Sequence, residues 1–209
     1  KDSLMRKSWN SLYHAWRNVI GFINIPSVCP ICGEPTAQKT DLFSTFLVCE
    51  NPSCEGKLIN KLDHFCGKKG LDIKGLSKAT LEKLINWGWV SNYKDLFELK
   101  NHRAEWIRTP GFGIRSVDNI LNAIESGREC ELPAFIASLG IPLIGNTASK
   151  ALQEAFRKWN EFIYAVDEYF DFSVLPNFGM EMHNNIINFD YREARFIADN
   201  YIQFNDYEA

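Results

Sequence analysis

The sequence predicts a mainly α-helical fold that begins with a small cysteine-rich module around a short β-hairpin and continues as four helix-hairpin-helix units. Two observations carry this prediction: two close cysteine pairs lie near the start, and a short glycine-containing turn recurs four times after them. With 209 residues, 45% of them hydrophobic, the chain can bury a core. No apolar run approaches the ~18 residues that cross a membrane.

The first segment, residues 1–25, is expected to hold an amphipathic helix over residues 4–20. Its large apolar side chains recur at helical spacing and share one face: Trp9, Leu12, Tyr13, Trp16, Val19 and Ile20. Such a stripe is more typical of packing than of ligand binding. The chain begins at Lys1 and not at Met, which leaves open whether it is a fragment or a full-length protein. No signal peptide is visible, so a cytoplasmic location is expected.

Four cysteines indicate a metal site. Cys29 and Cys32 form one close pair, and Cys49 and Cys54 form a second pair after sixteen residues. Each pair can bring two thiolates onto one knuckle, as a tetrahedral zinc ion requires. We expect a zinc finger over residues 26–56, whose β-prone middle forms a strand or hairpin. Four thiolates leave no open position for water, so the zinc would be structural and the module a rigid joint.

A disulfide scaffold is the alternative for these cysteines, and it fits less well because the chain is long and lacks an export signal. The isolated Cys66 and Cys130 are expected to be small buried apolar residues. His64 is expected to pack within a helix and not to bind the metal. A redox-active thiol protein stays open as a further alternative, since it requires only that the cysteines be free of metal.

A short turn recurs at spacings of 36, 32 and 34 residues. The four copies are Gly75-Leu76-Ser77, Gly111-Phe112-Gly113, Leu143-Ile144-Gly145 and Asn177-Phe178-Gly179. Each precedes a segment with apolar residues at helical spacing, so the repeat predicts equivalent units that bury their apolar faces against one another. We place this helix-hairpin-helix domain at residues 57–204, followed by a tail at 205–209.

Each turn has the features of a phosphate-binding hairpin. Glycine lets the backbone approach a partner closely, and the helix that starts at once presents unpaired N–H groups and the positive end of its dipole. The alternative, a tight turn between packed helices, suffices for any single copy, whereas four copies in phase favour phosphate binding by some of them.

The copies are not equal. The second has both glycines and an arginine in the first helical turn, and the third offers polar capping residues with a lysine one turn later. The first gains two lysines, while the fourth has Glu181 and no nearby cation, so we expect the fourth to be structural. The candidate DNA-binding residues are Lys74, Gly75, Lys78, Gly111, Gly113, Arg115, Gly145, Asn146, Thr147 and Lys150.

The net charge of −3 hides an asymmetry along the chain. Residues 57–83 carry seven lysines against three acids, whereas residues 161–209 carry ten acids against two arginines. Phosphate contact should therefore favour the first region and avoid the last. A solvated helix face explains the lysines equally well.

Beyond these patterns, the chain resembles a known family over roughly residues 26–204. Cys29-Pro-Ile-Cys-Gly33 with Cys49-Glu-Asn-Pro-Ser-Cys54 resembles the zinc finger of bacterial NAD-dependent DNA ligases. The segments 61–65 and 71–76 look like the region that follows it, and Ser138–Ala148 is similar to the third helix-hairpin-helix of that family. In this order, a zinc finger followed by four such units is highly specific.

The resemblance implies a large enzyme that seals nicks by moving AMP from NAD to a lysine and then to a 5′-phosphate. The lysine belongs to a Lys-X-Asp-Gly motif of an adenylation domain, and no such motif occurs here. The adenylation domain, most of the OB domain and the BRCT domain are thus absent from this chain, in which Val19–Ile25 could be a remnant OB strand. No catalytic residue is assigned, and whether the chain is itself part of an enzyme stays open.

The expected ligands are zinc in this chain, NAD in the absent adenylation domain, and duplex or nicked DNA read without base identity. Adenylation and OB domains are expected in the same polypeptide or in a partner chain, with no membrane. The alternative is a stand-alone, non-catalytic DNA-binding or scaffold protein derived from the same region.

Overall fold

The computed structural model describes residues 25–40 and 45–205. They fall into two compact units, Lys1–Lys57 and Leu58–Ala209, which we describe separately. The helix expected over residues 4–20 lies outside the described residues, and so does all of the expected tail except Asn205. No helix in the described ranges is both long and apolar enough to span a membrane.

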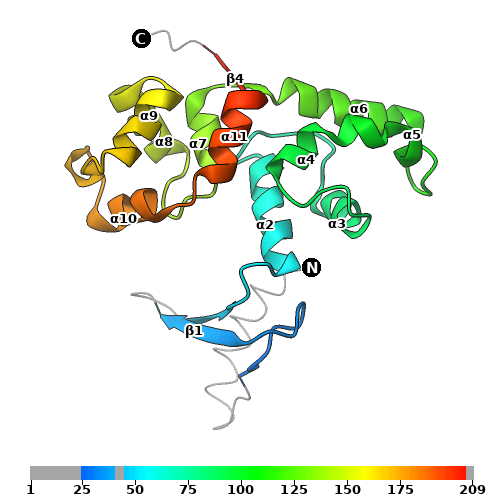
Figure 1. The fold of residues 1–209 in the computed structure, drawn as a ribbon, viewed down its shortest axis with the longest axis horizontal. Helices are drawn as coiled ribbons and strands as arrows, with labels where there is room; N and C mark the ends of the chain where they lie inside the picture. Colours follow the sequence, from blue (N-terminus) through cyan, green and yellow to red (C-terminus); the bar gives the residue numbers. More distant parts are fainter. Residues whose placement is uncertain (1–24, 41–44, 206–209) are drawn as a thin grey trace. The chain divides into compact units, whose positions relative to one another are not determined.

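The first unit holds a small antiparallel hairpin (Figure 1). Strand β1 (Thr36–Thr40) pairs with β2 (Thr45–Cys49), with Thr36 opposite Cys49. The expected hairpin is thus present, but its first strand begins earlier than the β-prone stretch at residues 40–48. The residues of β1 are mostly exposed and polar, so no alternation of apolar side chains marked them as a strand.

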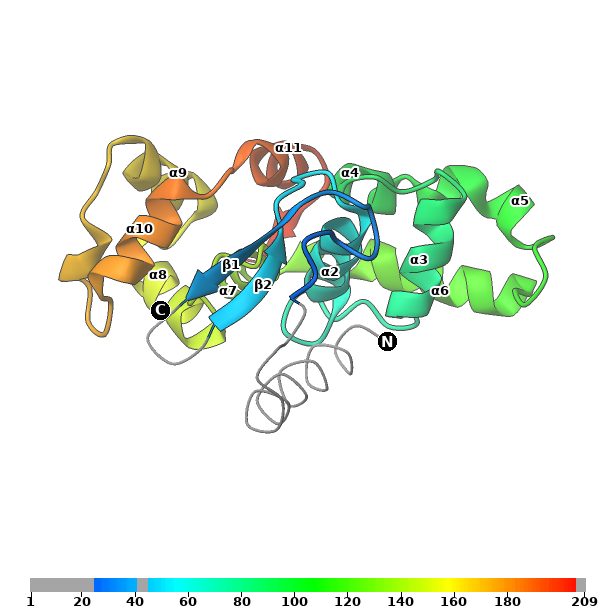
Figure 2. The same ribbon diagram turned by 90° about the horizontal axis from the view of Figure 1, so that it is seen from below.

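Helices are the main elements of the second unit, which confirms the mainly α fold (Figures 1 and 2). Helix α2 (Glu55–Cys66) begins in the first unit and continues into the second. The next elements are α3 (Lys78–Asn86), α4 (Tyr93–Phe97), the 3-10 helix η1 (Leu99–His102), α5 (Arg103–Trp106) and α6 (Ile114–Ser126). They are followed by β3 (Glu129–Cys130), α7 (Leu132–Ser138), α8 (Asn146–Phe156), α9 (Trp159–Asp167), η2 (Phe172–Val174), α10 (Met180–Asn188), α11 (Arg192–Asn200) and β4 (Gln203–Phe204).

The helical unit has two halves. Helices α3–α6 gather on one side and α7–α10 on the other, with α11 between them (Figures 1 and 2). One continuous apolar core runs through both halves. Its largest fully buried side chains are aromatic: Trp106, Tyr93, Phe65, Phe135, Phe162 and Phe172. A shared core of this kind fixes the turns between the helices relative to one another.

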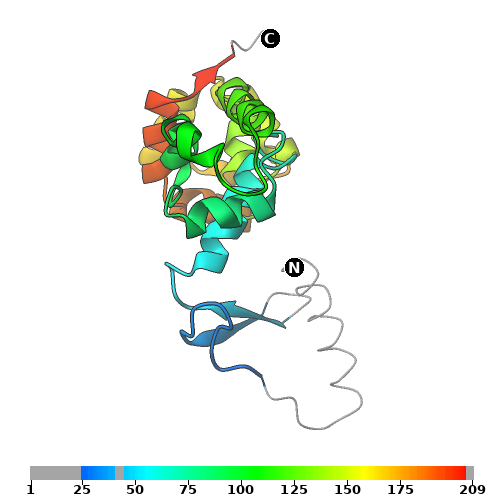
Figure 3. The same cartoon turned by 90° about the vertical axis from the view of Figure 1, so that its right-hand side faces the viewer.

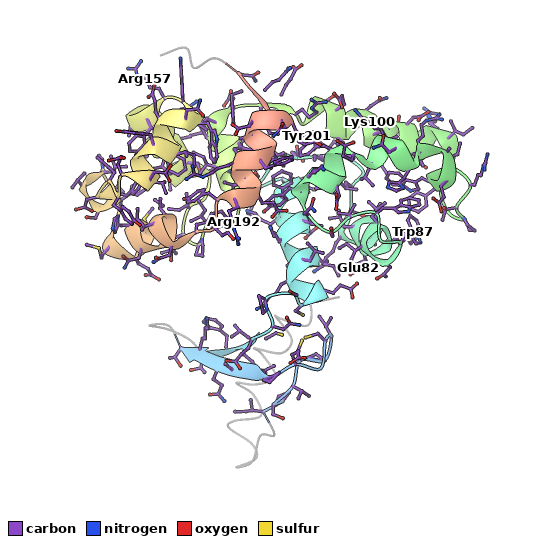
Figure 4. The ribbon with its side chains drawn as sticks, viewed as in Figure 1. Glu82, Trp87, Lys100, Arg157, Arg192 and Tyr201 are labelled. Carbon is purple, nitrogen blue, oxygen red and sulfur yellow. The ribbon has the colours of Figure 1, made fainter. Side chains whose placement is uncertain are left out.

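The end of the chain ties onto the connection between the two halves. After α11 the chain runs into β4 (red strand in Figure 3), which pairs in parallel with β3. Arg128 Nε donates to the carbonyl oxygen of Tyr201 at 2.8 Å, and Tyr201 itself lies just past α11 (Figure 4). Neither strand was expected, because two-residue strands whose paired residues lie 74 positions apart leave no periodic signal in the sequence.

Glu193 of α11 joins three helices. One carboxylate oxygen accepts the Tyr93 N–H at the start of α4 at 2.7 Å, and the other pairs with Lys61 of α2. Glu193→Ala leaves that part-buried N–H without an acceptor. We therefore expect the free energy of unfolding to fall by about 1–2 kcal/mol and the thermal midpoint to fall by a few degrees. Thermal unfolding followed by circular dichroism measures this. Glu193→Gln keeps the acceptor and should lose less, and equal midpoints for Glu193→Ala and the unchanged chain would contradict the role.

Candidate metal centre and nucleic-acid interface

The four predicted metal ligands lie together in the first unit. Their Sγ atoms are all within 4.8 Å of one another, with Cys29 and Cys54 at 3.9 Å and Cys32 and Cys49 at 3.5 Å. Zinc–sulfur bonds of about 2.3 Å in a tetrahedron place the sulfurs about 3.8 Å apart, so the cluster fits such an ion. All six cysteines are free thiols, so no disulfide scaffold is present.

Local structure explains why the sulfurs converge. Gly33 adopts a left-handed conformation, with φ of 75°, and its N–H donates to the Cys29 carbonyl at 2.8 Å, which closes the first knuckle. Cys49 ends β2, and Cys54 immediately precedes α2. The hairpin between the two pairs therefore brings Cys49 and Cys54 next to Cys29 and Cys32. Cys66 and Cys130 are buried in the helical unit and do not belong to the cluster. His64 Nε2 donates to the Ala137 carbonyl at 2.8 Å.

The thiols of the cluster differ in pKa. The Glu34 backbone N–H lowers the pKa of Cys32 to about 7, while desolvation raises the pKa of Cys49 to about 12 and also raises that of Cys54. Four thiolates packed this closely need a positive ion to stabilise them together. A divalent metal supplies that charge, so the donor set suits zinc and leaves no position for a reacting water.

In the helical unit, the four predicted turns share one backbone conformation. Their first residues, Gly75, Gly111, Leu143 and Asn177, have φ of 81°, 89°, 66° and 65°. Glycine adopts this left-handed conformation freely and asparagine tolerates it, whereas it costs leucine about 1–2 kcal/mol. The four copies therefore share a left-handed φ at this position even where glycine is absent.

Proline supports three of the turns, a signal that the sequence analysis missed. Pro110, Pro142 and Pro176 each precede the residue with positive φ. In each of these three turns, the N–H of the residue after the positive-φ residue donates to the carbonyl of the residue before the proline, at 3.0–3.1 Å. The pairs are Phe112 to Thr109, Ile144 to Ile141 and Phe178 to Leu175. Proline followed by a residue of positive φ is the pattern of a type II turn, because the ring fixes the φ that the second position requires.

A helix starts directly after each turn. The N-cap residues are Ser77, Gly113, Gly145 and Gly179 for α3, α6, α8 and α10, and all four are extended. In the first copy, Ser77 caps its own helix by accepting the Thr80 N–H at 3.2 Å. The three glycine caps offer no side-chain acceptor, so N–H groups of the first turn stay available to a ligand.

The expectation that polar residues cap the third helix is wrong. Gly145 is the N-cap of α8, and Asn146 and Thr147 are its first two helical residues. The N-cap needs an extended backbone, and glycine takes it here without providing a side-chain oxygen. Both residues remain exposed beside the turn.

The middle residue of each turn anchors it in the core. Leu76, Ile144 and Phe178 are buried, and Phe112 is partly buried against Trp87 and Trp106. The residues on either side of each are exposed. The turns thus do not pack inward, and their backbones face solvent.

Cations accompany the first three turns. Arg115 in the first turn of α6 and Lys150 in α8 are exposed, and among the described residues neither has a recorded ion pair. Lys74 pairs with Asp72 at 2.6 Å, and Lys78 donates to Asn60 at 2.8 Å. At the fourth turn, Glu181 lies in the first turn of α10. An anion would therefore meet positive charge at the second and third turns and a carboxylate at the fourth.

Comparison with known proteins gives one consistent result. The chain is 38% identical over 136 residues to the DNA ligase of Lachnoclostridium phytofermentans, which is 65% of this chain and 21% of that protein. It is 33% identical over 176 residues to the DNA ligase of a Sulfurihydrogenibium species, a match that covers 82% of this chain and 23% of that protein. It is 34% identical over 168 residues to the DNA ligase of Campylobacter jejuni, which covers 80% of this chain and 24% of that protein. No protein-family model matches the chain.

The chain spans only about a fifth to a quarter of the length of these curated relatives. Over 65–82% of its length, the chain is homologous to a partial region of proteins named DNA ligase.

Proposed function

We propose that this chain is the DNA-gripping region of an NAD-dependent DNA ligase that seals nicks in replication and repair in the cytoplasm. The observation that carries the proposal is the four-fold repeat of a turn with positive φ followed at once by a helix. Homology to proteins named DNA ligase supports DNA as the ligand.

The second and third turns are the proposed phosphate sites. Their helices start at glycine caps, which supply no side-chain acceptor, so the N–H groups of the first helical turn can donate to phosphate oxygens. At the second turn, the N–H of the cap residue Gly113 itself donates to Ser116 Oγ at 3.0 Å. Arg115 and Lys150 add positive charge at the same ends. Contacts of this kind carry no base identity, which suits an enzyme that must act at nicks in any sequence. Lys74, Gly75 and Lys78 of the first turn are proposed as weaker contacts, because the lysines already have protein partners.

The cysteine cluster is proposed to hold zinc through Cys29, Cys32, Cys49 and Cys54 as a structural ion. When bound, zinc supplies a fixed cross-link among four thiolates. The chemistry of ligation is proposed to lie elsewhere in the ligase, because this sequence has no Lys-X-Asp-Gly motif that could accept AMP from NAD.

The salt dependence of binding tests the two phosphate sites. Arg115→Ala and Lys150→Ala should each weaken binding to a nicked duplex whatever its sequence, and each should reduce the slope of log affinity against log salt by about one. Fluorescence anisotropy over a series of salt concentrations measures both effects.

Arg157→Ala is the matched control for Lys150→Ala. Arg157 is exposed just past the opposite end of α8, away from the glycine cap (Figure 4). It should leave the slope unchanged. Equal slopes for all three variants and the unchanged chain would refute the assignment of phosphate contacts to the second and third turns.

A further inference from the structure

Exposed apolar side chains gather at the tips of the hairpins. In the helical unit, Ile114 is 60% exposed beside the second turn, Leu143 is 58% exposed in the third and Met180 is 59% exposed beside the fourth. Singly exposed apolar side chains are common on protein surfaces, so exposure alone does not identify a contact with a partner.

Leu143 is the most unusual of the three. It takes the left-handed conformation that glycine or asparagine takes at the equivalent positions of the other turns. Its side chain gains little from burial, so the protein's own packing does not account for a leucine in this conformation. Strain of this kind is kept where the surroundings fix it and function uses it.

The surroundings hold the tip of the third turn rigidly. Asn185 of α10 donates to the Pro142 carbonyl at 3.0 Å, and the Ile144 N–H donates to the Ile141 carbonyl at 3.0 Å. Leu143 also borders an open hollow of about 760 Å³ beside α2, which leaves one flank of the tip free. Pro142 and Leu143 thus form a fixed apolar point next to the Gly145 helix start.

We propose that Leu143 is a wedge that enters the minor groove of duplex DNA and partly unstacks a base step. The inference rests on the proposed function, because phosphate contacts at Gly145 would bring this tip to the edge of the groove. Leucine and proline are among the side chains that architectural proteins insert between base steps, and such insertion needs no base identity. A discontinuous strand at a nick lowers the cost of unstacking there.

The test uses the 209-residue chain and nicked duplexes that carry 2-aminopurine at successive positions around the nick, because its fluorescence rises when it unstacks. The unchanged chain should raise fluorescence about twofold or more at one or two positions. Leu143→Asn should abolish this rise, while the salt slope of binding stays as it was. Leu143→Phe keeps an apolar wedge and should keep the rise.

Two controls accompany this test: the thermal midpoint of Leu143→Asn and the variant Met180→Asn at another tip. Leu143→Asn places asparagine where Asn177 stands in the fourth turn, so its thermal midpoint should rise by about 2–4 °C, which separates loss of the wedge from loss of folding. Met180→Asn removes an equally exposed apolar tip from the turn without cations and should leave the fluorescence rise intact.

Three outcomes would overturn the wedge: no rise with the unchanged chain, a rise that persists in Leu143→Asn, or a rise that Met180→Asn abolishes equally. In those cases, the slopes of log affinity against log salt for Arg115→Ala and Lys150→Ala still test the proposed phosphate sites independently of the wedge. Failure of the unchanged chain to bind duplex DNA at low salt would overturn both.

Discussion

Replacing Cys32 with serine should abolish zinc binding and unfold the segment between Pro26 and Lys57. The hairpin in this segment has two strands of five residues each, which cannot fold alone in water. Zinc bound by the four cysteines would therefore supply most of its stability, on the order of 10 kcal/mol in comparable modules. The helical unit keeps its own core, so the loss should stay local.

Metal content and local structure measure this result. The purified chain should hold about one zinc ion and the variant close to none, while hydrogen exchange in residues 45–54 should become fast in the variant. Cys130→Ala is the control, because Cys130 lies in the helical core outside the cluster. It should keep its zinc. Full occupancy in Cys32→Ser would disprove the proposed ligand set.

Features governed by short-range geometry could be predicted from the sequence. The cysteine spacing predicts the cluster because a knuckle needs only a few consecutive residues. The turns were predictable because a residue with positive φ before a helix favours glycine. Where glycine is absent, the regular spacing of the copies identified Leu143 and Asn177 at the equivalent positions.

Features that depend on distant contacts could not be predicted. Glu193 bonds the Tyr93 N–H across 100 residues, and β3 pairs with β4 through two residues of each strand. Neither leaves a periodic pattern in the sequence. Two contacts of the first turn also could not be predicted: Ser77 accepts the Thr80 N–H of its own helix, and Lys74 pairs with Asp72. We expect both contacts to weaken phosphate binding at this turn.

Replacing Gly113 and Gly145 together with valine should weaken binding to duplex DNA by about 100-fold while leaving the helices formed. Each hydrogen bond from an amide to a charged phosphate is worth about 1.5–3 kcal/mol, and a branched side chain at each cap would hold the phosphate away from the amides. Both glycines have negative φ, and a Cβ at either position meets no atom within 4 Å, so valine fits the folded chain. Fluorescence anisotropy at low salt measures affinity, and far-ultraviolet circular dichroism measures helix.

Gly179→Val separates phosphate binding from helix capping. Gly179 has the same extended backbone and the same free space around its Cα, and it also caps a helix, but Glu181 stands in the first turn of that helix. Valine there carries the same capping cost, about 1 kcal/mol or less, without removing a phosphate site. Unchanged affinity in Gly179→Val beside a large loss in the double variant would show that DNA approaches the second and third turns closely, as contact with their exposed amides requires. Equal affinity in all three proteins would mean that these turns are merely tight connections between helices.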